Sequence, residues 1–126
     1  MELENYILWR EVITEDELHA LLNELTVKKD IFSVQVLLEI LEELSERIQK
    51  FYGTFDLKNE EKDIVMSVLC DLTDFSNLST MESLIFVMFG FELDEYCEYL
   101  EIKIDFIQDS NVKKEVTRSI KEYREQ

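Results

Sequence analysis

Turn-forming residues are nearly absent from this chain of 126 residues, which has no proline and only two glycines, Gly53 and Gly90. A sheet protein of this length needs many tight turns, and most of those turns use proline or glycine. The shortage of both residues therefore favours helices joined by short loops. It also excludes collagen-like and low-complexity chains.

Basic residues are scarce as well. The chain has 13 Lys and Arg against 29 Asp and Glu, so its formal net charge is −16 and its sequence pI is about 4.3. Affinity for a phosphate backbone comes from Lys and Arg that displace counterions. We therefore expect no nucleic-acid partner, and we expect a charged partner to be a basic protein.

Residues that commonly carry chemistry are few. The single histidine, His19, follows Asp16 at helical spacing, but one imidazole and one carboxylate do not fill a metal shell. Cys70 and Cys97 lie in apolar patterns without zinc-ligand spacing, so we expect buried free thiols. We expect a protein that is not an enzyme and has no cofactor.

Long apolar stretches are missing too. The longest run, Leu84 to Phe91, has eight residues including Gly90, whereas a membrane-spanning helix needs roughly 20. The N-terminal residues Met1 to Asn5 show neither the basic region nor the cleavage site of a secretory signal. These features predict a cytoplasmic protein without a membrane partner.

Apolar residues recur every three or four positions through most of the chain, which is typical of amphipathic helices. Capping boxes are expected at Thr14 with Glu17 and at Ser79 with Glu82, and Asn59 can cap a further helix. Gly53 and Gly90 are expected to end helices as left-handed caps. The expected helices cover about residues 3–11, 15–27, 31–52, 60–72, 81–89, 93–107 and 112–123.

Residues 99–107 allow two interpretations, because Leu100, Ile102, Ile104 and Phe106 alternate as a strand would. We favour a helix, since no convincing partner strand exists. The expected fold is all-α: one domain of six or seven helices over residues 1–126, arranged as a helical bundle or a short stack of antiparallel helix pairs.

The negative charge is densest between residues 92 and 109. Like charges at helical spacing repel, so this cluster is either a solvated face or a surface that meets a cationic partner. Aromatic residues near a charged surface often anchor an interface. The candidate partner-binding residues are Glu92, Asp94, Glu95, Glu98, Tyr99, Glu101 and Asp105, with Trp9 and Phe55 as further apolar anchors.

A second constellation joins Glu42-Glu43-Leu44-Ser45-Glu46 with Glu60-Glu61-Lys62-Asp63. It resembles the carboxylate pattern of the all-helical MazG-like nucleotide pyrophosphohydrolases, although Lys62 departs from that pattern. The resemblance implies a magnesium ion that bridges a triphosphate. Its ligands would be Glu43, Glu46, Glu60 and Asp63, with Glu42 assisting.

In size, acidity and helical character the whole chain is similar to the bacterial immunity proteins that neutralise toxin domains. That resemblance implies a cognate toxin, often a basic nuclease, held by an acidic face. Complementary charge would speed the association. A helical scaffold, or a homodimer through the apolar segment Met81 to Phe89, is the remaining alternative.

Overall fold

The structure is a computed structural model that describes all residues from Met1 to Gln126. It contains helices and no strand, which confirms the expected all-α class. The α-helices are α1 (Glu15–Lys28), α2 (Val34–Gln49), α3 (Asn59–Leu72), α4 (Leu78–Phe91), α5 (Asp94–Lys103) and α6 (Ser110–Glu125). Short 3-10 helices are η1 (Leu3–Leu8), η2 (Lys29–Ile31) and η3 (Ile104–Phe106).

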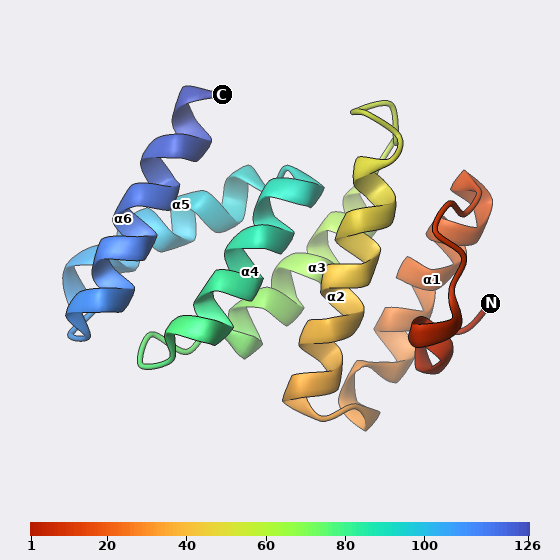
Figure 1. Cartoon of the computed structure of the whole chain (residues 1–126), viewed down its shortest axis with the longest axis horizontal. Helices are drawn as coiled ribbons and strands as arrows, with labels where there is room; N and C mark the ends of the chain where they lie inside the picture. The colour runs from red at the N-terminus through yellow and green to blue at the C-terminus, as the bar shows by residue number, and fades with distance from the viewer.

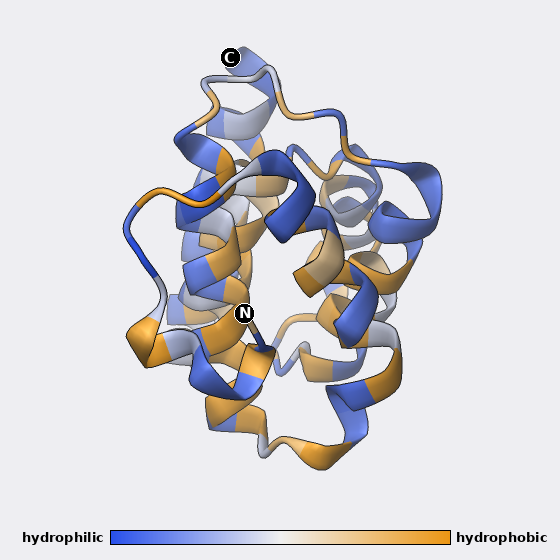
Figure 2. Ribbon diagram, turned by 90° about the vertical axis from the view of Figure 1, so that its right-hand side faces the viewer, coloured by the Kyte–Doolittle hydropathy of each residue, from blue (hydrophilic) through white to orange (hydrophobic).

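The helices form three antiparallel pairs that stack side by side in two layers (Figure 1). Helices α2, α4 and α6 make one layer, and α1, α3 and α5 make the other; Figure 2 views both layers from the N-terminal end of the row. The expected stack of helix pairs is therefore confirmed. Because α1, α3 and α5 run in the same direction, their N-terminal ends lie at the same edge of the molecule.

Helix α4 is the centre of its layer and packs against α2 on one side and α6 on the other. Most of its apolar residues are buried in this position, and Phe86 is 39% exposed. The apolar segment from Met81 to Phe89 is thus largely used by the core of one chain. This placement leaves little of the surface that a homodimer through α4 would need.

Gly90 was expected to end α4, but the helix continues to Phe91. Its role is steric: a Cβ atom on Gly90 would lie 1.7 Å from the Oγ of Ser45 on α2. The absence of a side chain lets the two helices pack closely here. The residue that takes the left-handed conformation after α4 is Glu92, with φ of 55°.

Helix α1 begins as the sequence predicts. The Thr14 Oγ1 accepts a hydrogen bond from the backbone N–H of Glu17, and the Glu17 carboxylate accepts one from the backbone N–H of Thr14. This is a complete capping box. The predicted apolar stripe is fully buried: Leu18, Leu21, Leu22 and Leu25.

Several other boundaries differ from the expectation. The first segment is a 3-10 helix that kinks at Asn5 and ends at Leu8, rather than a regular helix to residue 11. The helix expected over residues 31–52 is α2, which Ser33 caps and which ends at Gln49. Gly53 is left-handed, with φ of 83°, but it belongs to the following turn.

The caps of α3 and α4 lie one or two residues before the positions that the sequence predicts. Asn59 is the first residue of α3 rather than its cap, and Glu61 accepts a hydrogen bond from the backbone N–H of Lys58. Helix α4 starts after Asn77, whose side chain accepts from the backbone N–H of Thr80. The ambiguous segment is helical, as favoured, with α5 followed by η3.

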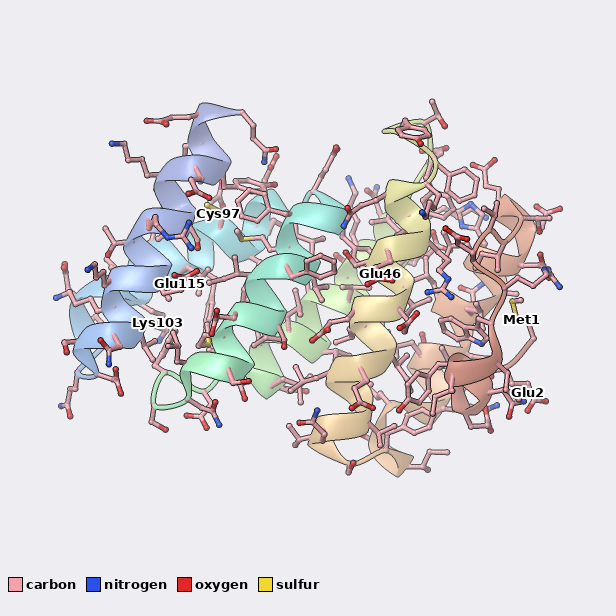
Figure 3. The ribbon with its side chains drawn as sticks, viewed as in Figure 1. Met1, Glu2, Glu46, Cys97, Lys103 and Glu115 are labelled. Carbon is pink, nitrogen blue, oxygen red and sulfur yellow. The ribbon has the colours of Figure 1, made fainter.

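Both cysteines are free thiols, as expected. Cys97 is buried near the contact between α5 and α6, and Cys70 is half-buried (Figure 3). Burial raises the pKa of both thiols above the ordinary value. None of the helices combines the length and the apolar character that a membrane crossing requires.

Candidate functional site

Exposed carboxylates lie along the edge of the molecule where α1, α3 and α5 begin. We call this region the acidic edge. None of its carboxylates takes part in an ion pair. Its members are Glu15, Asp16, Glu60, Asp63, Glu92, Asp94 and Glu95.

The helix dipole explains why the fold tolerates these charges. Carboxylates in the first turn of a helix interact favourably with the unsatisfied backbone N–H groups there. The parallel arrangement of α1, α3 and α5 then brings three such turns to one edge. The result is a negative field that no basic side chain of the chain neutralises by direct contact.

The predicted cluster around α5 is divided by the structure. Glu92, Asp94 and Glu95 lie at the acidic edge, whereas Glu98 and Glu101 lie farther along the helix. Glu101 is bound by Arg124 of α6, so its charge is already paired within the molecule.

Two further members of the predicted cluster also differ in their surroundings. Asp105 is exposed in η3, at the opposite end of α5 from the acidic edge. Asp94 accepts a hydrogen bond from the Tyr123 hydroxyl at 2.5 Å. Burial and the nearby Asp94 carboxylate raise the pKa of Tyr123. The tyrosine therefore remains a donor that holds α5 against α6.

Tyr99 is half-buried rather than a free surface residue. Its ring stacks on the buried ring of Tyr96 with centroids 5.8 Å apart, and the ammonium of Lys103 lies 5.8 Å from its centroid. The Tyr96 hydroxyl is satisfied by Thr73 at 2.8 Å. Tyr99 thus covers a core residue and exposes only part of its ring.

A hollow of about 380 Å³ opens beside the acidic edge, between the end of α2, the loop that follows it and the end of α4. We call it the edge pocket. Ile48 and Phe91 are buried in its floor, while Tyr52 and Glu92 are exposed at its rim. Its lining consists of Ile48, Gln49, Tyr52, Gly53, Phe55, Leu57, Phe89, Gly90, Phe91 and Glu92. Two predicted site residues far apart in the sequence, Phe55 and Glu92, are therefore brought together.

The loop that forms one wall of this pocket is fastened to α1 and α3. The His19 ring stacks on Phe55 with centroids 4.6 Å apart, and its Nδ1 lies 2.7 Å from Oε2 of Glu61. Glu61 is only 2% exposed and also accepts the backbone N–H of Lys58 at 2.9 Å. These contacts fix the position of Phe55 at the pocket.

Sequence reasoning did not single out Glu61 as a buried residue. It lies in a run of charged residues, which is typical of an exposed helix surface, and its partner His19 is 42 positions away in the sequence. The only local signal was its spacing of three residues from Lys58, which places it at the reaching position of a helix cap. His19 is partly buried, and its partner is Glu61 of α3 rather than Asp16, which lies three residues before it on α1.

Both non-glycine residues with a positive φ line the edge pocket. They are Tyr52, with φ of 50°, and Glu92, with φ of 55°. A side chain in this conformation costs roughly 1–2 kcal/mol relative to ordinary helical angles. Such strained residues tend to cluster at functional sites. The exposed fraction of Tyr52 is 90%, so this aromatic side chain gains little from the core.

Trp9 is not a surface anchor, which corrects the expectation for this residue. Its exposed fraction is 7%, and its indole N–H donates to the backbone carbonyl of Glu2 at 2.9 Å. The guanidinium of Arg47 lies over the ring and donates to the carbonyls of Trp9 and Arg10. Trp9 and Arg47 therefore hold the N-terminal segment on α2.

The proposed set of magnesium ligands is not assembled. Glu43 and Glu46 project from α2 (Glu46 is labelled in Figure 3) and pair with Arg47, with Glu46 at 3.7 Å. Glu60 and Asp63 belong to the acidic edge on α3 instead. No group of three or more metal-ligating side chains occurs in the structure. The local resemblance to the pyrophosphohydrolase pattern is thus not matched by the arrangement in space.

No protein-family model matches the chain, and no curated protein or solved structure is significantly similar to it. The candidate site consequently rests on the charges, the pocket and the contacts described above.

Proposed function

We propose that this protein is a binding protein that holds a basic protein partner on the acidic edge, and that it acts as an inhibitor of the immunity type. The observation that carries the proposal is the set of seven exposed carboxylates without an ion pair at the edge. A basic toxin domain, such as a nuclease, is the class of partner that fits.

Charge complementarity supports this assignment. The carboxylates repel one another in the free protein, and a cationic partner relieves that repulsion. Opposite fields also raise the association rate toward about 10⁸–10⁹ M⁻¹s⁻¹ at low salt. Fast capture suits an inhibitor that must reach a toxin before the toxin reaches its target.

A long residence time of the partner on this protein requires apolar contacts in addition to charge complementarity. The edge pocket supplies it next to the acidic edge, with Phe55 in its wall and the exposed ring of Tyr52 at its rim. Tyr99 is the remaining aromatic candidate from the predicted set and lies farther along α5. An interface centred on the pocket would combine a desolvated apolar centre with a charged rim.

The direct test is affinity capture of the tagged protein from a lysate of its source cells, at low and at moderate salt, with identification by mass spectrometry. We expect one stoichiometric basic protein that is lost or weakened as the salt rises, because screening reduces electrostatic attraction. That protein should be toxic when expressed alone. A partner that is acidic, or a yield that does not depend on salt, would contradict the electrostatic mechanism.

A further inference from the structure

We propose that the edge pocket receives an arginine side chain of the partner, with the aliphatic stem against the apolar wall and the guanidinium at the Glu92 carboxylate. This inference rests on the proposed function, since it names the group by which a basic protein partner is anchored. The pocket has about 380 Å³, within the roughly 300–1,000 Å³ typical of ligand sites.

The lining chemistry selects the occupant. Six of the ten lining residues are hydrophobic, and Glu92 is the only acidic one. A purely apolar group would fill the floor but would leave the carboxylate without a partner as water is displaced. A side chain with an apolar stem and a cationic head satisfies both parts of the lining.

Arginine meets these demands better than lysine. Its planar guanidinium can stack on an aromatic face and can bind a carboxylate through two parallel N–H groups. The pocket offers the aromatic side chains of Tyr52, Phe55 and Phe89 together with the Glu92 carboxylate. Cation–π contact adds most when the site is shielded from water, as it would be under a bound partner.

The surrounding charges leave Glu92 available. Lys62 lines a smaller adjoining hollow of about 130 Å³ with Glu92, but it makes no ion pair with it. Lys50, just beyond the end of α2, is paired with Glu11 at 3.3 Å. Asp94 and Glu95 follow Glu92 and add negative potential at the rim.

The test is an NMR titration of the ¹⁵N-labelled full chain with N-acetyl-arginine methylamide, compared with the lysine and norleucine analogues. We expect saturable shifts of the Gly53, Gly90 and Glu92 amides with the arginine compound. The uncharged norleucine compound should bind about fivefold more weakly, the change expected for loss of one exposed ion pair. Equal binding of norleucine, or shifts confined to α3 and α5 outside the pocket, would overturn the assignment.

Glu92→Gln should weaken the arginine compound about fivefold as well. Glu82→Gln, which removes an exposed and unpaired carboxylate near the start of α4, away from the pocket, is the matched control and should leave binding unchanged. Unchanged affinity in Glu92→Gln would contradict the proposal. Shifts of the pocket amides on simple dilution would instead assign the pocket to a second copy of this chain and would also overturn it.

The titration separates this inference from the proposed function. If the pocket does not bind the arginine compound while a basic partner is still captured from lysate, only the proposal of an arginine anchor is overturned. A pocket that binds arginine selectively stands as a site even if the lysate yields no basic partner, and in that case only the inhibitor role fails.

Discussion

Gly90 shows how one residue sets the distance between two helices. A Cβ atom there would lie 1.7 Å from Ser45 Oγ and 3.0 Å from Ser45 Cβ. Contacts this short force either the backbone or the Ser45 side chain to move.

Gly90→Ala should therefore destabilise the protein by about 1–3 kcal/mol, as overpacking of a core does. Ser45→Ala removes the closest atom, so the double variant should recover part of the loss. The measurement is the free energy of unfolding in urea for both single variants and the double variant. Strictly additive effects would contradict a direct clash between the two residues.

Glu92 occupies a position that favours glycine. It follows α4 in the left-handed conformation, and its N–H and that of Leu93 bond back to Phe89 and Met88. This is the usual place for a left-handed glycine at a helix end.

Glu92→Gly should accordingly stabilise the free protein by about 1 kcal/mol, because the backbone strain is removed. The same change removes the carboxylate from the edge pocket and should weaken partner binding. Thermal unfolding and binding would be measured on the same preparations. A loss of stability in Glu92→Gly would show that the carboxylate supports the fold rather than the site.

The buried Glu61 depends on His19 for a hydrogen bond. His19→Ala should destabilise the protein by roughly 1–3 kcal/mol, the cost of leaving a buried polar group with too few partners. His19→Phe keeps a ring against Phe55 but loses the bond, so it separates stacking from hydrogen bonding. Urea unfolding measures each loss, and a His19→Phe variant as stable as the wild type would exclude a contribution from the Glu61 bond.

At the scale of elements, the start of α1 makes a pH-dependent contribution to the free energy of unfolding. The backbone N–H of Thr14 and the guanidinium of Arg10 lower the pKa of Glu17 from 4.5 to about 2. A depressed pKa in the folded state contributes stability that is fully present above the unfolded value and is lost as the pH falls through the folded value. The contribution should thus disappear between about pH 4.5 and pH 2.

Glu17→Gln should remove this contribution and leave the others in place. The difference in unfolding free energy between the wild type and Glu17→Gln should shrink as the pH falls from 4.5 to 2. Urea denaturation at several pH values measures that difference. All other carboxylates are the same in both proteins, so their contributions cancel in the difference. A difference that stays constant across this range would contradict the capping role of the Glu17 carboxylate.

Local patterns predicted the elements that depend on local contacts. The Thr14 box and the leucine stripe of α1 appear in the structure as expected, because a cap and a spacing of three or four residues involve neighbours in the chain. Gly90 was misread as a helix end, because its role depends on Ser45 of another helix. Trp9 was predicted to be a surface anchor and is buried for the same reason, since its burial depends on contacts with Arg47 and with the backbone of Glu2.

At the scale of the whole molecule, the site follows from the parallel course of α1, α3 and α5. The sequence indicated the excess of acid around residues 92–109 but not that the first turns of three helices share an edge. It also could not indicate that Phe55 and Glu92 border one pocket, since a loop and a helix end meet only in the folded chain. The magnesium pattern failed for the converse reason, because residues that match in sequence lie on separate surfaces.

Capture by charge-reversal variants tests the central claim most directly. Glu60→Lys with Glu95→Lys changes the acidic edge, and Asp71→Lys with Glu82→Lys makes the same change in net charge at the opposite edge, where α3 ends and α4 begins, at exposed carboxylates without ion pairs. The yield of the basic partner from lysate would be quantified by mass spectrometry, after circular dichroism has shown that both variants are folded. We expect the edge variant to lose the partner while the control retains it. Equal retention by both variants would contradict recognition through the acidic edge.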